Sequence, residues 1–190
     1  MNNVLKVLIF IAVIFVVLHY RKYRYYTSVY QIDQQELEYI KGDDLYNQHN
    51  PLIITFIEDI TLKENINEYR LFSLLSFNKN FTNIKSNGLY NVHPNELCLI
   101  RPKNEIRIEL VNPKFKKYFK KNTNRGVFYN YVLEKENYER VESIEIILRE
   151  YNILYVPRHW FFKINNGDES IDVFTCDNLV SFFSKRLTTN

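Results

Sequence analysis

Few side chains in the sequence could carry chemistry, and the histidines come first among them. The chain has 4 histidines, and His159 lies in the stretch NILYVPRHWFFKI (152–164), between a basic residue and three aromatic residues. An imidazole beside apolar strands could be one ligand of a metal site. It could equally lie at the start of a buried strand, hydrogen-bonded or in solvent, as most histidines do. The stretch therefore fits either the wall of a metal site or the buried end of a sheet.

The motifs of other common chemistries are missing from the sequence. It contains no glycine-rich phosphate loop, no His-x-x-x-His pair, no nucleophile elbow and no Cys-x-x-Cys. The 2 cysteines, Cys98 and Cys176, are far apart in the sequence. We therefore expect two reduced, mostly buried thiols rather than a disulfide framework or a zinc site. The acidic stretches GDD (42–44) and GDE (167–169) are typical of turns.

The overall composition predicts a packed domain and gives little reason to expect nucleic acid as a partner. Hydrophobic residues make up 46% of the 190 residues and aromatic residues 16%. A formal net charge of +3 is too small to indicate nucleic-acid binding by itself. The clustered basic stretch KFKKYFKK (114–121) is typical of a solvated face, although it could contact phosphates or anionic lipid headgroups. The abundance of Asn, Lys, Ile and Tyr is typical of an AT-rich genome, such as that of a large DNA virus or an AT-rich microbe.

The amino-terminal segment is the longest apolar run of the chain. From Val4 to Leu18 only Lys6 is polar, and a run of about 20 apolar residues spans the core of a bilayer as a helix. We therefore expect one transmembrane helix over residues 4–20, within a membrane anchor that covers residues 1–27 and includes interfacial tyrosines. A cleaved signal peptide is one alternative, but the positive residues cluster after the apolar run. A buried helix of a soluble protein is the other.

The charges around this segment predict its orientation. Arg21, Lys22 and Arg24 outnumber Lys6 and the terminal amine on the other side. The positive-inside tendency then places the carboxy-terminal domain on the cytosolic side of the membrane. Reduced cysteines agree with that side. The lipid bilayer, reached through residues 4–20, is therefore the first partner that the sequence predicts.

Residues 28–190 are expected to form one domain. Asp33 and Glu36 have the spacing of a capping box and predict a helix that ends near Gly42. A second helix is expected over 61–78 and a third over 177–187. Apolar runs and alternation predict strands within 51–59, 96–102, 104–113, 126–134, 142–150, 152–157, 159–164 and 170–176. The fold class should be mainly β with flanking helices (α+β), closed as a barrel or a sandwich.

The stretch EIILREYNILYVPRHWFFKI (145–164) resembles the second half of the cupin-like, Jumonji-C-type double-stranded β-helix domains. In that family a strand, a Gly-Asp turn and an apolar run ending in proline precede two variable residues, two aromatic residues and a histidine. Here residues 153–157 match the apolar run, and Trp160 and Phe161 match the aromatic pair. A weaker match, VHPNELCLIRPKNEIRIELVNP (92–113), is similar to the family's His-x-Asp segment. The resemblance covers about residues 31–176.

The resemblance implies a site that has lost its metal ligands. Active members hold Fe(II) with two histidines and a carboxylate, and leave positions open for 2-oxoglutarate and dioxygen. The matching positions here are His93, Asn95 and Phe162, but an amide brings no charge and a phenyl ring has no lone pair. His159 is a weak alternative ligand, because an offset of three residues points it to the face opposite Phe162 on a strand. Arg107 stands where the family often has a lysine that binds the cosubstrate.

The leading hypothesis is a double-stranded β-helix (a cupin-like jelly roll) preceded by one transmembrane helix. It would act without metal, cofactor or catalytic residues, as a binding or structural module with an unidentified protein partner, and a virion membrane is one expected setting. The alternative is an active membrane-anchored Fe(II)/2-oxoglutarate-dependent hydroxylase with a rearranged site around His93 and His159. A third hypothesis is an interaction domain with a different fold.

Overall fold

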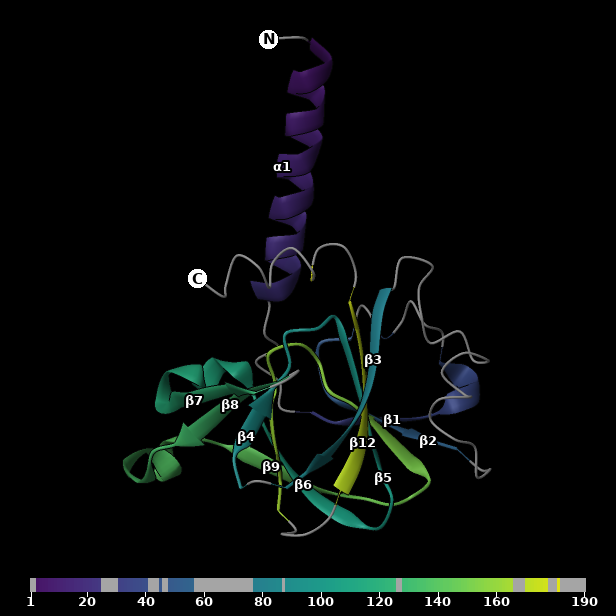
Figure 1. The fold of residues 1–190 in the computed structure, drawn as a ribbon, viewed down its shortest axis with the longest axis vertical. Helices are drawn as coiled ribbons and strands as arrows, with labels where there is room; N and C mark the ends of the chain where they lie inside the picture. The colour runs from purple at the N-terminus through teal and green to yellow at the C-terminus, as the bar shows by residue number, and fades with distance from the viewer. Residues whose placement is uncertain are drawn as a thin grey trace.

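The computed structural model of the protein describes residues 3–24, 31–40, 45, 48–56, 77–86, 88–125, 128–165, 170–177 and 181. In this part of the chain a long helix is followed by a domain built mainly from strands (Figure 1). The predicted mainly β fold is therefore confirmed. The helices predicted over 61–78 and 177–187 lie almost entirely outside the described residues.

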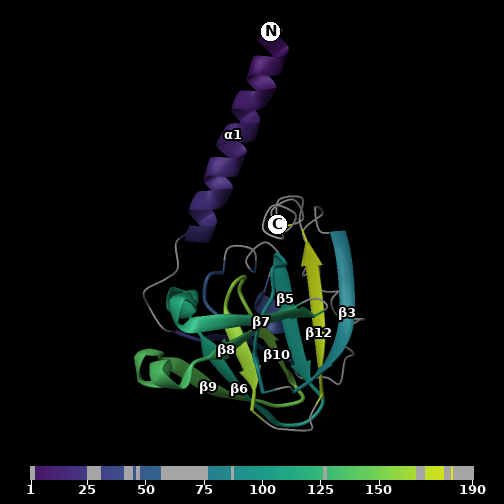
Figure 2. The same ribbon diagram turned by 60° about the vertical axis from the view of Figure 1, so that its left-hand side comes forward.

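The long helix α1 (Asn3–Arg24) covers the apolar amino-terminal segment. It extends away from the two sheets in both views of the ribbon (Figures 1 and 2). Its described apolar side chains are exposed, from 42% for Ile14 to 66% for Phe10. Within the described part of the chain, no helix has both the length and the apolar character needed to cross a membrane. The transmembrane helix predicted over residues 4–20 is therefore not found.

The helix predicted from Asp33 to Gly42 is wrong in its first turn. Asp33–Glu36 form strand β1, which pairs in parallel with β2 (Leu52–Thr55), and only Leu37–Tyr39 form a short 3-10 helix, η1. The Asp33 carboxylate does not act as a helix cap, because it accepts hydrogen bonds from the Gln31 and Gln48 side chains at 2.8 and 2.7 Å. Pairing with a neighbouring strand thus overrides the local capping pattern.

The described strands of the domain form two six-stranded sheets. Sheet A has the order β1-β2-β10-β5-β12-β3, and sheet B has the order β7-β8-β4-β11-β6-β9. The remaining strands are β3 (Phe77–Lys85), β4 (Tyr90–Val92), β5 (Leu97–Pro102), β6 (Ile106–Val111), β7 (Phe119–Arg125), β8 (Phe128–Leu133), β9 (Ser143–Leu148), β10 (Asn152–Tyr155), β11 (Phe161–Ile164) and β12 (Ser170–Asp177). Two further 3-10 helices are η2 (Pro113–Tyr118) and η3 (Lys135–Arg140). Each predicted strand is found, although the strand predicted from residue 159 begins at Phe161, whereas β1, β3, β4 and β7 were not expected.

The strand pairing defines a jelly roll. The first strand of the barrel pairs with the last, β3 with β12, and the following pairs are β4 with β11, β5 with β10 and β6 with β9, all antiparallel. This nesting is that of one long antiparallel hairpin wound around a barrel, so that its strands alternate between two facing sheets. The cupin-like architecture expected from the sequence resemblance therefore follows from the topology itself.

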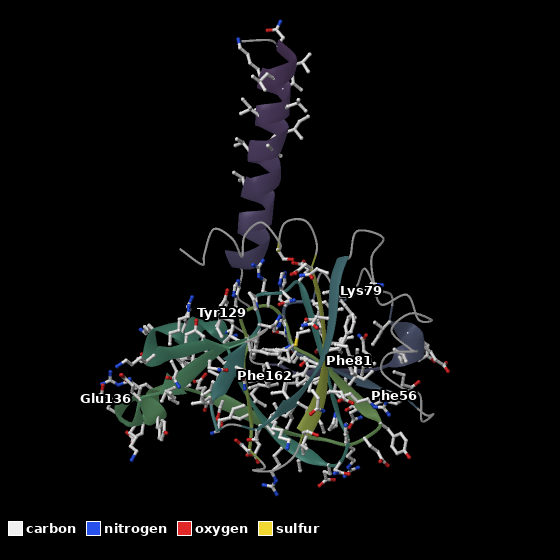
Figure 3. All side chains as sticks on the ribbon, viewed as in Figure 1. Phe56, Lys79, Phe81, Tyr129, Glu136 and Phe162 are labelled. Carbon is white, nitrogen blue, oxygen red and sulfur yellow. The ribbon has the colours of Figure 1, made fainter. Side chains whose placement is uncertain are left out.

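The main core lies between the two sheets, and alternation along the strands fills it. On β6 the buried residues Ile106, Ile108 and Leu110 face this core, whereas Arg107 and Glu109 point the other way. Phe162 lies among the core side chains at the centre of the domain (Figure 3). Two smaller clusters cover the outer faces: one packs Leu37 of η1, Ile40 and Leu45 on sheet A, and the other packs aromatic residues of β7, β8 and β11 on sheet B.

Two isoleucines on paired strands test which face carries the stability. Ile108 is fully buried between the sheets, whereas Ile147 on β9 is 50% exposed. Ile108→Ala should lower the free energy of unfolding by about 2–5 kcal/mol, because it leaves a cavity in a packed core. Ile147→Ala should change it by less than about 0.5 kcal/mol. Urea unfolding of the two variants measures both values, and equal losses would contradict this assignment of faces.

Candidate functional site

The positions matched to the metal ligands of the resembled family come from neighbouring parts of sheet B. His93 and Asn95 follow the end of β4, and Phe162 lies on β11. β4 and β11 are antiparallel neighbours, with Val92 opposite Phe161 and Asn91 opposite Phe162. The topology therefore brings the two segments to one end of the barrel. It does not give their side chains the roles of metal ligands.

His93 is fully buried and hydrogen-bonded to the backbone between β10 and β11. Its Nε2 lies 2.8 Å from the carbonyl oxygen of Val156 and 3.1 Å from that of Pro157. Carbonyl oxygens only accept hydrogen bonds, so Nε2 carries the proton and donates. Nε2 therefore has no lone pair to offer a metal ion, and in the neutral ring the lone pair lies on Nδ1. His93 thus ties the end of β4 in sheet B to the chain that leaves β10 in sheet A.

Phe162 is fully buried and packs in the core between the sheets. Its ring meets Phe128 edge to face, with the ring centroids 5.5 Å apart and an interplanar angle of 84°. Trp160, two residues earlier, faces the same core and donates from its indole nitrogen to the carbonyl oxygen of His49 at 3.1 Å. Aromatic side chains therefore occupy the side of β11 on which the resembled family places a metal ligand.

Asn95 and Thr175 are buried polar residues at this end of the barrel, with 3% and 1% of their surface exposed. The side-chain oxygens Oδ1 of Asn95 and Oγ1 of Thr175 have no hydrogen-bond partner among the described residues. Thr175 pairs with Cys98 across β12 and β5. The Cys98 thiol is buried, and burial, followed by the nearby Cys176, raises its pKa. A thiol with a raised pKa stays protonated and is a poor metal ligand.

His159 lies in a turn and not on a strand, so the prediction that β11 begins at this residue is wrong. The turn is closed by the Trp160 N–H, which donates to the Pro157 carbonyl at 3.2 Å, and His159 has a φ of 71°. Because His159 is not on a strand, its distance of three residues from Phe162 does not determine which way its side chain faces. Burial, then the nearby charges of Arg158, His93 and Lys116, lower the pKa of His159 to about 3. His159 is thus neutral at physiological pH, in a positively charged neighbourhood.

Arg107 lies on the outer face of sheet B. It forms an exposed ion pair with Glu145 on β9, with Nη1 and Oε1 3.4 Å apart. The alternation of β6 points Arg107 away from the core that Phe162 occupies. The structure thus does not bring Arg107 together with the residues matched to the metal ligands.

The residues of this site do not fit a bound Fe(II) ion. The Nε2 atom of His93 is committed as a donor, Phe162 has no lone pair, and the amide of Asn95 brings no charge. Over the described residues, no three His, Cys, Asp or Glu side chains gather in a way that could hold a metal ion. The residues at the positions matched by the sequence resemblance thus do not supply the donor set of an Fe(II) centre.

No family model matches the chain, and no curated protein matches it. Solved structures that are similar include RmlC from Streptococcus suis in complex with dTDP-D-xylose, which is 11% identical, with a TM-score of 0.31, over 65% of this chain and 56% of that one. The dTDP-4-dehydrorhamnose 3,5-epimerases from Elizabethkingia anophelis NUHP1 and Bacillus anthracis str. Ames are each 15% identical over 65% of this chain and 62% and 63% of theirs, with TM-scores of 0.32 and 0.31.

The chain thus covers less than two thirds of the length of these epimerases. Similarity at this level says nothing about the activity or the substrate of this chain. The assignment to a cupin-like jelly roll rests on the strand pairing of the chain itself.

The sequence reasoning missed a second polar cluster, formed by Tyr90, Glu109 and Lys163 on the outer face of sheet B. Alternation along the strands could have indicated where two of these side chains point. Glu109 lies between two core residues of β6, and Lys163 lies between two core residues of β11, so both side chains must face outward. What the sequence could not show is that β6 and β11 are neighbours, with Glu109 opposite Lys163.

Replacement of His93 tests its role as a structural donor. His93→Ala leaves the Val156 and Pro157 carbonyls without this donor, and should lower the free energy of unfolding by about 1–3 kcal/mol. His93→Gln, whose amide can still donate, should lose less. Urea unfolding measures stability, and elemental analysis with a 2-oxoglutarate decarboxylation assay measures metal use. Loss of iron-dependent turnover in His93→Ala at unchanged stability would instead make His93 a ligand.

Titration of His159 predicts a loss of stability in acid. Its pKa is about 3 in the folded protein against 6.5 in the unfolded chain, so the unfolded chain binds more protons between these values. The contribution is fully present above 6.5 and is lost as the pH falls toward 3. His159→Asn tolerates the positive φ and removes the titration, so it should lose less stability from about pH 7 to about pH 5. Parallel stability curves would contradict the assignment.

Proposed function

We propose that the protein is a binding module, built on a cupin-like barrel without a catalytic metal, that is held at a lipid bilayer by α1. The observation that carries the first part is the use of His93. The one imidazole at a matched ligand position donates to backbone carbonyls and holds the barrel together. A barrel in which the histidine at the matched position is a structural hydrogen-bond donor is suited to binding rather than to oxygen chemistry.

The apolar surface of α1 supports the membrane part of the proposal. Successive residues of a helix are about 100° apart, so the five residues from Val7 to Ile11 together face every side of α1. All five are apolar and are 48–66% exposed. A helix that is apolar all round is stable when apolar material surrounds it, and a bilayer provides that on every side. The proposal requires that α1 enter the bilayer, and the test below determines how it lies there.

The basic residues of η2 and β7 support contact with lipid headgroups. Lys116, Lys117, Lys120 and Lys121 are exposed, and a lysine near an anionic membrane surface contributes about 1 kcal/mol. The Nζ atoms of Lys117 and Lys121 lie 4.9 and 4.8 Å from the ring centroids of Tyr118 and Tyr129. Tyr129 lies on the side of the domain toward α1 (Figure 3). A cytosolic orientation and a virion membrane stay predictions, as does the protein partner.

Vesicle flotation of the full chain tests the membrane part. The wild type should float with phosphatidylcholine vesicles, and anionic lipid should strengthen binding. The double variant Leu8→Lys and Ile11→Lys should bind at least about tenfold more weakly, because it places charges in apolar surroundings. Ile147→Lys is the matched control, since it charges an isoleucine that is 50% exposed on β9, and it should float like the wild type.

Equal flotation of all variants, or no flotation of the wild type, would contradict the membrane role. Alkaline carbonate extraction then separates a helix that lies in the interface from one that passes through the bilayer. A protein released by carbonate is interfacial, and a protein retained in the vesicles is integral.

A further inference from the structure

A pocket of about 270 Å³ opens on the outer face of sheet B. It lies on the opposite side of this sheet from Phe162 and the main core, because its residues Glu109 and Lys163 alternate with core residues on β6 and β11. Strands β4, β6, β8 and β11 form its base, and η3 with the segment before β9 borders it. Small-molecule sites have volumes of about 300–1,000 Å³, so this pocket suits a single ring.

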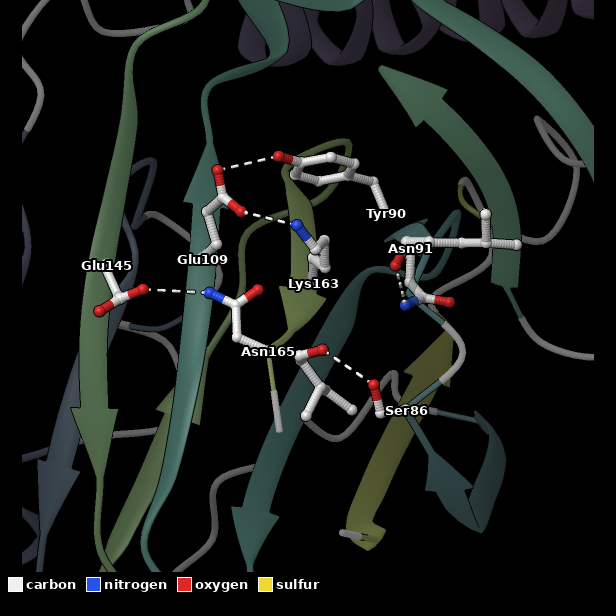
Figure 4. Close-up of polar contacts among 9 residues, drawn as sticks. Ser86, Tyr90, Asn91, Glu109, Glu145, Lys163 and Asn165 are labelled. Carbon is white, nitrogen blue, oxygen red and sulfur yellow. Dashed lines mark hydrogen bonds and ion pairs between the residues drawn. The ribbon is translucent and has the colours of Figure 1, made fainter. Parts of the chain in front are cut away.

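The floor of the pocket is a connected group of three polar side chains (Figure 4). The Tyr90 hydroxyl donates to Oε1 of Glu109 at 2.8 Å, and Nζ of Lys163 donates to Oε2 at 3.2 Å. Lys163 also lies over the Tyr90 ring, 5.1 Å from its centroid. The side chains of Lys163 and Glu109 keep 28% and 18% of their surface exposed, so a ligand can reach them. Their three contacts fix one geometry for the floor.

The walls of the pocket are mainly apolar and aromatic. Tyr131 and Leu133 of β8 are almost buried, with 9% and 8% exposed, and Val141 lies beside them. Burial, followed by the nearby Tyr129, raises the pKa of Tyr131, so its phenol stays neutral and can donate a hydrogen bond. Tyr138 of η3 lines the pocket and is 56% exposed. An apolar wall around a few fixed polar groups is the usual form of a small-molecule site.

The charges of the floor restrict the ligand. The carboxylate of Glu109 and the ammonium of Lys163 cancel, so neither an anion nor a cation gains a net attraction. A ligand ammonium would compete with Lys163, which already lies between the Tyr90 ring and the Glu109 carboxylate. Two of the roughly four acceptor sites of the carboxylate, and one of three donors of the ammonium, are used by the contacts above. Hydroxyl groups both donate and accept, so neighbouring hydroxyls can bind both groups at once.

We propose that this outer-face pocket binds a neutral polyhydroxylated ring, such as a single sugar unit. Hydroxyls on one edge of the ring bind Glu109 and Lys163, and the C–H face of the ring packs against the tyrosine wall that includes Tyr138. This proposal gives the class of ligand for the proposed binding module, and it rests on that part of the proposed function alone. It needs neither α1 nor the bilayer, so a failed vesicle test leaves it standing and a failed sugar test leaves the membrane role standing.

Saturation-transfer NMR on the full chain tests the proposal, in a detergent whose headgroup is not a sugar. The probes are the methyl glycosides of glucose, galactose and mannose, with cyclohexanemethanol as a ring without the hydroxyl pattern and glycine betaine as a cation probe. We expect saturable binding of at least one glycoside with a Kd of about 10 mM or tighter. Tyr138→Ala should weaken it about tenfold, since it removes an exposed wall residue that folding does not require.

Tyr39→Ala is the matched control, because Tyr39 is a 73% exposed tyrosine of η1 outside the pocket, and it should bind like the wild type. Glu109→Gln changes the floor of the pocket instead of its wall, and this second variant should also weaken glycoside binding. No saturable glycoside binding would overturn the proposal, as would equal binding of cyclohexanemethanol. Preference for glycine betaine would make the pocket a cation site instead. Unchanged glycoside affinity in both pocket variants would place the binding elsewhere.

Discussion

The filling of the barrel by its own aromatic side chains is the constraint on which the rest of the structure depends. Trp160 and Phe162 face the space between the sheets, and Phe128 meets Phe162 from β8. Protein interiors are packed as densely as organic crystals, so each ring takes volume that a bound small molecule would need. The aromatic residues that pack the core of the jelly roll therefore also fill the space between its two sheets.

His93 shows how a buried imidazole can act as a structural hydrogen-bond donor. A metal ligand needs a lone pair on the ring nitrogen, whereas Nε2 of His93 presents an N–H to two carbonyl oxygens. These carbonyls belong to the connection between β10 and β11, which crosses from sheet A to sheet B. The bond therefore holds the two sheets at one end of the barrel. A buried imidazole between fixed carbonyls is a structural tie, with a cost of removal similar to that of other buried hydrogen bonds.

The sequence predicted the parts of the fold in which one face of a strand is buried. The alternation of Ile106, Ile108 and Leu110 with Arg107 and Glu109 could be read directly, because period two is a local property. β3 was missed because it is an edge strand rich in Asn and Lys, with Phe81 46% exposed, so it has no apolar face to detect. Asp33 misled because a capping box is local, whereas pairing of β1 with β2 is not. His159 was misplaced because a turn with positive φ has no period.

The two faces of sheet B explain why the inner site was partly predictable and the outer pocket was not. The inner positions follow from spacing along single segments, so a family resemblance could locate them. The outer cluster needs β6 beside β11 and β4 beside β11, which brings together Tyr90, Glu109 and Lys163 from three separate segments. Because successive side chains alternate across a sheet, the residues that fill the barrel and those that form the pocket lie on the same strands. Phe162 can therefore fill the core while the next residue, Lys163, keeps its outward geometry, so that one strand serves both the packed interior and the outer pocket.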